Sequence, residues 1–161
     1  MDTKVKRMAP QALLQAITGI NPAAQERPNT NVPAVRVPVE KLHAFLQLLR
    51  DDSRFSFDFL MDHTAIDWIA DNQFELVYQL YSTLHGHSLM VGVLIDRESP
   101  LAPTVSDLWP IAEWQEREVY DLFGIPYDDH PDLRRLFLED DWTGYPLRKD
   151  YQDPNMLQRP Q

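Results

Sequence analysis

The sequence predicts an α+β fold, a two-layer domain with a mostly antiparallel sheet packed on helices, followed by a helix and a long extended C-terminal tail. Three observations support this fold class. Residues 38–50 carry apolar side chains at three- and four-residue spacing, which is typical of an amphipathic helix. Residues 55–95 contain runs that alternate with a period of two. Residues 125–151 have no long periodic pattern of either kind.

Composition limits the function. With 161 residues the chain has about the size of one domain. A net charge of -10 disfavours a nucleic-acid duplex or an anionic lipid surface as the main partner, because both would repel the protein. The chain has no cysteine, which excludes a disulfide framework, a thiol nucleophile and cysteine ligation of zinc or an iron–sulfur cluster. No apolar run approaches the ~20 residues of a membrane-spanning helix, so we expect no direct membrane span.

Residues 1–32 are predicted to be an N-terminal extension and linker. Within them, residues 9–18 form a short helix with Pro10 in its first turn. Residues 20–33 are rich in Pro, Asn and Ala without any period, which is typical of a linker.

Residues 33–124 are predicted to be the α+β core domain. A short strand over 34–37 leads into the amphipathic helix, and three strands follow as an antiparallel meander, because turn residues at 71–72 and 85–87 separate them. One face of this sheet is expected to pack under the helix. A last helix over 110–123 has Pro at its start and Gly just past its end.

Glu118 is the unusual residue of that last helix. Projection at ~100° per residue places it on the apolar side, between Trp114 and Leu122. An isolated buried charge costs several kcal/mol, so this carboxylate must be paired or protonated. Its candidate partners are arginines of the following segment, namely Arg134, Arg135 and Arg148. We expect the other face to be solvated, with pairs at four-residue spacing among Glu113, Arg117 and Asp121.

Residues 125–161 are predicted to be an extended C-terminal docking tail. A structureless segment longer than ~12–15 residues is uncommon and usually has a task. A short helical turn can begin at Pro131, capped by Asp129 or His130. Large rings and arginines in an extended chain are typical of an interface. These residues leave open whether the tail wraps its own domain or lies across a partner.

Enzymatic alternatives are weaker. His130 among Asp128, Asp129 and Asp132 suggests a stand-alone metal-dependent hydrolase with Glu118 as the base, but the spacing matches no ligand pattern. The paired histidines at 85 and 87 supply only two ligands. The basic pairs at 134–135 and 148–149 are flanked by acids, which favours salt bridges over phosphate binding. We therefore assign no catalytic, cofactor-binding or metal-binding residue.

Three blocks carry a resemblance to a known family. They are EREVYDLFGI at 116–125, HPDLRR at 130–135, and Trp142 and Gly144 followed by PLRKDY at 146–151. In this order they resemble the 30-kilodalton subunit family, also called the C subunit family, of proton-pumping NADH:quinone oxidoreductase, respiratory complex I. The resemblance covers about residues 33–152. The chain departs from the common pattern at Asp128-Asp129, Tyr145 and Gln152, which puts a histidine-based role at position 145 in doubt.

The resemblance implies a cofactor-free structural and assembly component of the hydrophilic arm, peripheral to the cell membrane on its cytoplasmic side. NADH, quinone, FMN and iron–sulfur clusters would be bound by other subunits. The expected partners are the large quinone-site D subunit and the cluster-bearing B subunit, while the isolated chain would be non-catalytic. The alternative is the equivalent component of a membrane-bound hydrogenase or of a coenzyme F420H2 or plastoquinone-linked complex. We expect the interface and tail-anchoring residues to be Glu116, Arg117, Glu118, Asp121, His130, Arg134, Arg135, Trp142, Arg148, Lys149, Asp150 and Tyr151.

Overall fold

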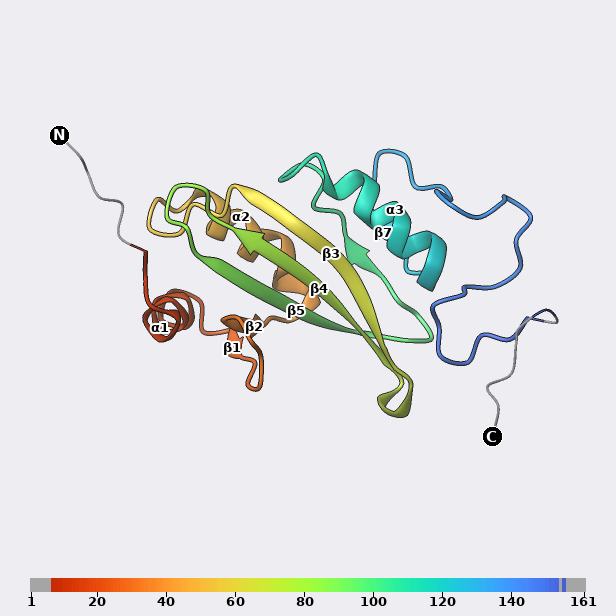
Figure 1. The fold of residues 1–161 in the computed structure, drawn as a ribbon, viewed down its shortest axis with the longest axis horizontal. Helices are drawn as coiled ribbons and strands as arrows, with labels where there is room; N and C mark the ends of the chain where they lie inside the picture. The colour runs from red at the N-terminus through yellow and green to blue at the C-terminus, as the bar shows by residue number, and fades with distance from the viewer. Residues whose placement is uncertain (1–6, 154, 156–161) are drawn as a thin grey trace.

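The computed structural model describes residues 7–153 and residue 155. Residues 1–6 of the predicted extension, and residues 154 and 156–161 of the predicted tail, lie outside the described residues. The fold is the predicted α+β class (Figure 1), with a mostly antiparallel sheet that packs on helices.

A five-stranded sheet with the order β1-β2-β5-β4-β3 forms the centre of the molecule. Its strands are β1 (Gln25–Glu26), β2 (Ala34–Arg36), β3 (Phe59–Trp68), β4 (Gln73–Tyr81) and β5 (Ser88–Asp96). The last three form the predicted antiparallel meander. β2 pairs with β5 in parallel, and β1 adds an antiparallel edge within the segment that we expected to be a linker.

The sheet buries one face completely along β4. Phe74, Leu76, Tyr78 and Leu80 alternate along this strand and are inaccessible to solvent. The turn before β4 ends at Asn72, which has a positive φ of 53°. Asparagine tolerates this left-handed conformation better than most residues, so it can close the turn after the short 3-10 helix η2 (Ile69–Asp71).

Helix α2 (Leu42–Asp51) covers that face and lies behind the sheet in Figure 1. A single 3-10 turn, η1 (Val39–Lys41), precedes it, so the helix predicted from residue 38 becomes regular only at Leu42. Its buried residues are the predicted apolar stripe, Leu42, Phe45, Leu46 and Leu49.

Helix α1 (Pro10–Ile20) lies at the edge of the sheet near β1 (Figure 1). Leu13 and Ile17 of α1 are fully buried and belong to the same hydrophobic core as α2 and the sheet. The division of the chain into extension, core domain and tail stays a proposal, and the packing of α1 bears directly on it.

The alternating pattern that begins at residue 55 precedes the strand itself. Regular pairing begins only at Phe59, and Ser56 has a positive φ of 45°. Phe55 and Phe57 are nevertheless fully buried. Alternation therefore indicates which side chains face the core, while the backbone of residues 55–58 turns instead of pairing.

Helix α3 (Ala112–Phe123) packs on the same face of the sheet as α2. Its Phe123 ring meets Phe74 of β4 edge to face, with ring centroids 6.2 Å apart. Gly124 ends the helix with a φ of 71°, as predicted for a residue just past the helix end. The flanking strands β6 (Ala102–Pro103) and β7 (Tyr127–Asp128) pair in parallel and fix both ends of the α3 region.

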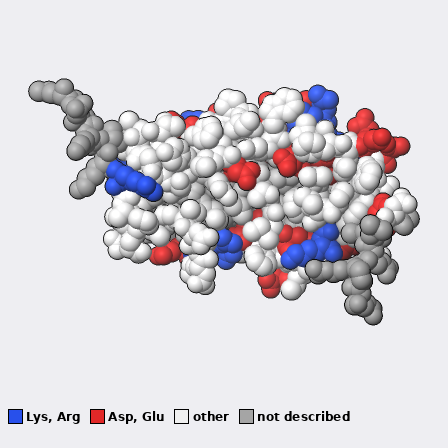
Figure 2. All heavy atoms as spheres, viewed as in Figure 1, with Lys and Arg blue, Asp and Glu red and all other residues white. Residues whose placement is uncertain are grey.

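The opposite face of the sheet faces the viewer in Figures 1 and 2, and it carries the buried acid Glu75. Glu75 accepts hydrogen bonds at 3.0 Å from Arg27, 3.0 Å from Arg36 and 2.9 Å from the Trp68 indole. Burial by itself would raise the pKa of Glu75, but these donors outweigh it and hold the pKa low. Gly92 leaves room for the Glu75 carboxylate, because a Cβ at position 92 would lie 2.7 Å from it.

Candidate functional site: the junction of helix α3 and the tail

Helix α3 buries two different sides, and Glu118 lies on neither. Glu118 and Trp114 are exposed, so the predicted burial of Glu118, and its pairing with an arginine of the tail, were wrong. The predicted apolar side is a broad face that contains Ala112, Trp114, Val119, Leu122 and Phe123. Of these, Ala112, Val119 and Phe123 do face the core, and together with Glu116 they form a stripe that spans only a ~60° arc.

Asp121 is the carboxylate that anchors the tail. Its side chain is fully buried, and its Oδ1 accepts a hydrogen bond from Arg135 at 2.8 Å. Its Oδ2 accepts three successive backbone N–H groups, those of residues 136, 137 and 138, at 3.1, 2.7 and 3.0 Å. Burial favours a higher pKa, but Arg135 and the three N–H groups outweigh it and lower the pKa of Asp121. The tail therefore folds back onto its own helix through a residue expected to be solvated.

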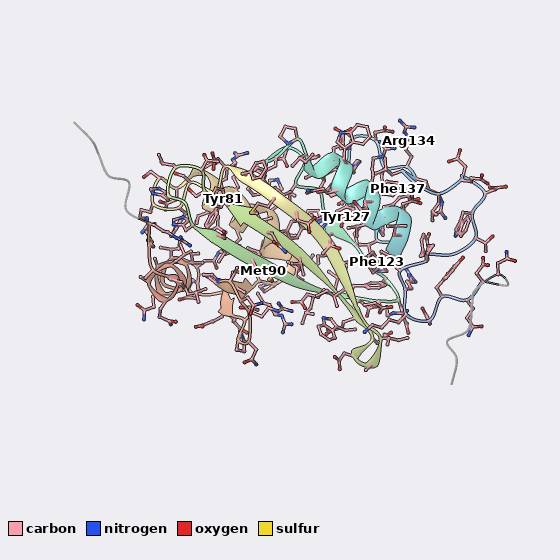
Figure 3. All side chains as sticks on the ribbon, in the orientation of Figure 1. Tyr81, Met90, Phe123, Tyr127, Arg134 and Phe137 are labelled. Atoms are coloured by element: carbon pink, nitrogen blue, oxygen red, sulfur yellow. The ribbon has the colours of Figure 1, made fainter. Side chains whose placement is uncertain are left out.

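Arg117 makes the second contact with the tail. Its guanidinium donates to the backbone carbonyls of Arg134 and Arg135 at 3.2 and 3.1 Å and lies 4.9 Å from the centre of the Trp114 ring. It does not form the expected ion pairs with Glu113 and Asp121. Arg134 points outward beside α3 in Figure 3 and pairs with Asp132 at an exposed site.

Arg148 is inserted between aromatic rings. Its guanidinium lies 5.2 Å from the centre of the Phe74 ring and 4.9 Å from that of Tyr145, and it donates to the Phe123 carbonyl at 2.6 Å. Tyr145 in turn lies against Gly124, where an added Cβ would collide with the ring. Cation–π contacts and a charge-assisted hydrogen bond thus fasten the end of α3 to the tail.

The far end of the tail is attached to β3. Asp67 is buried and binds Arg97 at 2.8 Å, and it also accepts the backbone N–H of Lys149 at 2.8 Å. Arg97 pairs with Asp150 at 2.5 Å, while the Lys149 ammonium lies 5.8 Å from the centre of the Trp68 ring. Nearby, the Tyr151 ring packs on Gly144, whose φ is 86°.

Glu116 is fully buried without a guanidinium or ammonium partner. It interacts with the Thr104 hydroxyl at 2.5 Å and accepts the Val105 backbone N–H at 2.7 Å. Burial raises the pKa of Glu116 to about 7 against the effect of these hydrogen bonds. The His130 ring nitrogen Nε2 is 3.7 Å away and donates to the Glu113 carbonyl at 3.0 Å.

The expected helical turn at Pro131 does not form. His130 Nδ1 accepts the backbone N–H of Asp132 at 3.0 Å, and residues 133–138 run without regular structure along α3. The Asp121 carboxylate supplies the acceptors that a helix would have supplied to the amides of residues 136–138.

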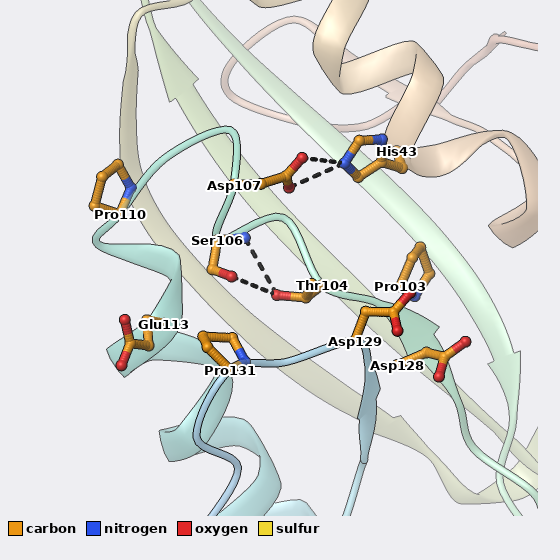
Figure 4. A pocket seen from close by; sticks show the side chains of 10 residues that line it. All are labelled: His43, Pro103, Thr104, Ser106, Asp107, Pro110, Glu113, Asp128, Asp129 and Pro131. Carbon is orange, nitrogen blue, oxygen red and sulfur yellow. Dashed lines mark hydrogen bonds and ion pairs between the residues drawn. The ribbon is translucent and has the colours of Figure 1, made fainter.

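A cavity of about 680 Å³ lies beside the start of α3 (Figure 4). Asp107, Glu113, Asp128 and Asp129 line it, and His43 pairs with Asp107 across its rim at 2.9 Å. Within residues 7–153 and 155, no group of three or more histidine or acidic side chains is placed to hold a metal ion. No helix in this same part of the chain is long and apolar enough to cross a membrane.

Glu116 was predicted as an interface residue, but its burial was not. A signal for that burial existed, because Glu116 shares the Ala112, Val119 and Phe123 stripe at helical spacing. Three further residues that hold the junction together were not predicted from the sequence. Asp67, Arg97 and Thr104 had no such signal, because their partners are 12 to 82 residues distant along the chain.

Sequence comparison identifies relatives of this chain. The family described as "Respiratory-chain NADH dehydrogenase, 30 Kd subunit" matches residues 35–155. The C subunit of NADH-quinone oxidoreductase from Moorella thermoacetica is 39% identical over 138 residues, which are 86% of this chain and 92% of that protein. The corresponding C subunit of Chloroherpeton thalassium is 40% identical over 70% of this chain, and the C/D subunit of Phocaeicola vulgatus is 46% identical over 74%. The chain spans 47% and 22% of the lengths of these two relatives.

Two solved structures share the fold. A chain of the membrane-bound sulfane sulfur reductase, an archaeal respiratory membrane complex, superposes with a TM-score of 0.76 at 30% identity, over 88% of this chain and 85% of that one. The trypsin-resistant fragment of Nqo5 superposes with a TM-score of 0.62 at 30% identity, over 78% of this chain and all of the fragment.

Proposed function

Because this chain belongs to the 30 kDa subunit family of respiratory-chain NADH dehydrogenase, we propose that it is a structural component of a proton-translocating NADH:quinone oxidoreductase. The observation that carries this proposal is the junction: a tail of polar and aromatic residues is held in one conformation by buried ionic anchors. Such a segment offers a preformed docking surface, and preorganisation lowers the entropic cost of binding.

The tail docks on the quinone-site subunits. The relative from Phocaeicola vulgatus is a single chain named as a C/D subunit, which supports the D subunit as the neighbour of this chain. The B subunit is the second expected partner. The chain itself contributes no redox group in this proposal, so NADH, FMN, quinone and the clusters are bound by other subunits on the cytoplasmic side of the membrane.

Purification of the native complex tests this function. A tagged full-length chain is expressed in its own host, solubilised in mild detergent and separated on a native gel. We expect it to migrate with quinone-site and nicotinamide-binding subunits and with NADH:quinone activity, and we expect metal analysis of the chain alone to find less than stoichiometric metal. A free monomer with bound metal and hydrolytic activity would exclude the proposal.

A related complex is the second candidate, favoured by the 0.76 TM-score to a chain of the archaeal sulfane sulfur reductase. The two candidates differ in the electron donor and acceptor rather than in the role of this chain. Co-purification of a nicotinamide-binding subunit favours NADH:quinone oxidoreductase. Its absence from an otherwise complete assembly favours the second candidate.

A further inference from the structure

Residues 137–142 form a loop that hydrogen bonds hold at both ends, and we call it the acidic loop. Asp121 binds the amides of residues 136–138 where the loop begins, and Arg135 donates to the Trp142 carbonyl at 3.0 Å where it ends. A turn hydrogen bond of 3.0 Å, donated by the Trp142 N–H to the Glu139 carbonyl, closes the loop. Both ends and the turn are thus positioned before any partner arrives.

The acidic loop exposes apolar and negative groups together. Phe137 is 64% exposed and Trp142 is 38% exposed. Between them stand Glu139, Asp140 and Asp141, which form no ion pair with any described residue. The sequence from 136 to 147 contains no Lys or Arg. Figure 2 shows acidic side chains gathered at the end of the molecule where the tail lies, and Figure 3 shows Phe137 on the tail beside α3.

Phe137 and Trp142 differ from other exposed aromatic residues, such as Phe59, because they stand in one short loop together with three acidic side chains. A fully exposed aromatic side chain can bury about 150–250 Å², and Phe137 and Trp142, which are already partly covered, can bury their remaining exposed area in a contact. Aromatic residues are enriched at interface hot spots. The loop cannot turn these rings inward, because its backbone is bound to Asp121 and Arg135. Phe137 and the exposed part of Trp142 are therefore available to another surface.

The charge of the loop selects the kind of surface. A second copy of this chain, with its net charge of -10, would repel the loop, and so would an anionic membrane. A recess of apolar side chains with a rim of Lys or Arg matches both features, because the rings fill the recess while the three carboxylates pair with the rim.

We propose that the acidic loop makes the main contact between the docking tail and a neighbouring subunit of the complex, where it binds a hydrophobic recess with a basic rim. This inference rests on the proposed function and names the contact that carries it. Phe137 and Trp142 provide the binding energy, and the acids set orientation and association rate.

The test uses the assembled complex, from the tagged full-length chain in its own host, with immobilised complex washed at increasing NaCl. We expect Phe137→Ala to lower the retained quinone-site subunits about tenfold or more, because truncation of a hot-spot ring has this effect. Phe59→Ala is the matched control, because Phe59 is 51% exposed and lies at the other end of β3 from the Asp67 anchor. It should retain the partners as the wild type does.

A neutral triple variant, Glu139→Gln with Asp140→Asn and Asp141→Asn, tests the charge. We expect it to weaken retention at low salt and to flatten the decline of retention with salt. Wild-type retention by both the triple variant and Phe137→Ala would overturn the docking proposal and leave the proposed function intact. If the wild-type chain retains no quinone-site subunit at all, the proposed function and this inference both fail.

Discussion

Asp121 determines the path of a segment that has no regular structure of its own. One carboxylate accepts an arginine and three consecutive backbone amides, so the tail needs no helix to satisfy its N–H groups there. Glu118, three residues earlier on the same helix, is exposed and makes no such contact. The difference between them follows from which side of α3 the tail covers.

Asp121→Asn should release the tail locally. Loss of the buried ion pair with Arg135, and of a charged acceptor for three amides, should cost about 3 kcal/mol. Exchange of the amides of residues 136–138 should accelerate about a hundredfold, while those of β4 stay protected. Hydrogen exchange followed by mass spectrometry measures both. Glu118→Gln is the matched control and should change neither; equal acceleration by the two variants would contradict the role of Asp121.

The pKa of Glu116 is raised and that of His63 is lowered, so the two residues change the stability of the protein with pH in opposite directions. Burial lowers the pKa of His63 to about 4, while its Nδ1 and Nε2 are hydrogen-bonded to the Val77 carbonyl and the Tyr127 hydroxyl. The unfolded His63, with its ordinary pKa of 6.5, binds more protons than the folded one, so its contribution to stability rises with pH from about 4 to 6.5. Glu116 has a raised pKa, so its contribution is present below 4.5 and is lost as pH rises to about 7. Between pH 4.5 and 6.5 the two contributions to stability nearly cancel.

Of these two contributions to the pH dependence of stability, Glu116→Gln should leave only that of His63. The amide resembles the protonated carboxyl but does not ionise, so the variant escapes a cost of about 3 kcal/mol that the wild type incurs above pH 7. The free energy of unfolding of the variant minus that of the wild type should therefore be about 3 kcal/mol larger at pH 8 than at pH 4.5. Urea unfolding at pH 4.5, 6.5 and 8 measures it. Wild-type and variant curves that run parallel would show that Glu116 does not have a raised pKa.

At the scale of elements, α3 is a helix between two partners. The sheet covers Ala112, Val119 and Phe123, and the tail covers Arg117 and Asp121. A helix of this kind buries charged residues without losing their hydrogen bonds, because the tail brings backbone carbonyls and amides to them. Its C-terminus is part of the joint, since Gly124 both ends the helix and makes room for Tyr145.

Gly124→Ala should disturb that joint. An alanine would have to adopt a φ of 71° and its Cβ would meet the Tyr145 ring, so we expect a loss of about 2 kcal/mol or more. Gly19→Ala in α1 is the control, because no atom lies within 4 Å of a Cβ there and helix propensity should add about 0.5–1 kcal/mol. Thermal unfolding compares them. A Gly124→Ala protein as stable as the wild type would show that Tyr145 can move at little cost.

At the scale of the whole molecule, the described residues share one core. Leu13 and Ile17 of α1, the α2 stripe, the sheet and the sheet-facing side of α3 belong to the same buried cluster. The tail contributes differently: after Tyr127, none of the described residues is buried as a whole, and polar anchors hold the segment. The molecule thus combines an apolar domain with an ionically attached tail.

The membership of α1 in the core can be measured. Leu13→Ala should destabilise the whole protein by about 2–5 kcal/mol, because it leaves a cavity at a fully buried position. Gln15→Ala, at an exposed position of the same helix, should stay within about 0.5 kcal/mol of the wild type. Urea unfolding of the full-length chain provides both values. An unchanged midpoint for Leu13→Ala would favour residues 1–32 as a separate extension.

Sequence by itself determined the features that depend on local periodicity and on residue chemistry. The period of two between residues 73 and 96, the apolar stripe of α2 and the left-handed Gly124 follow from rules that act over a few residues. The family blocks likewise identified the chain as a relative of the 30 kDa subunit, and the family comparison confirmed this identification.

Only the tertiary structure decided which charges are buried. Whether Asp121 or Glu118 anchors the tail depends on the direction in which residues 133–151 cross α3, and the anchors at Asp67 and Glu75 depend on partners from 7 to 82 residues away in the chain. Helical periodicity ranks the sides of a helix by their apolar content. It does not reveal a side that is covered by backbone amides and carbonyls, because every residue has these groups and the sequence therefore does not distinguish them.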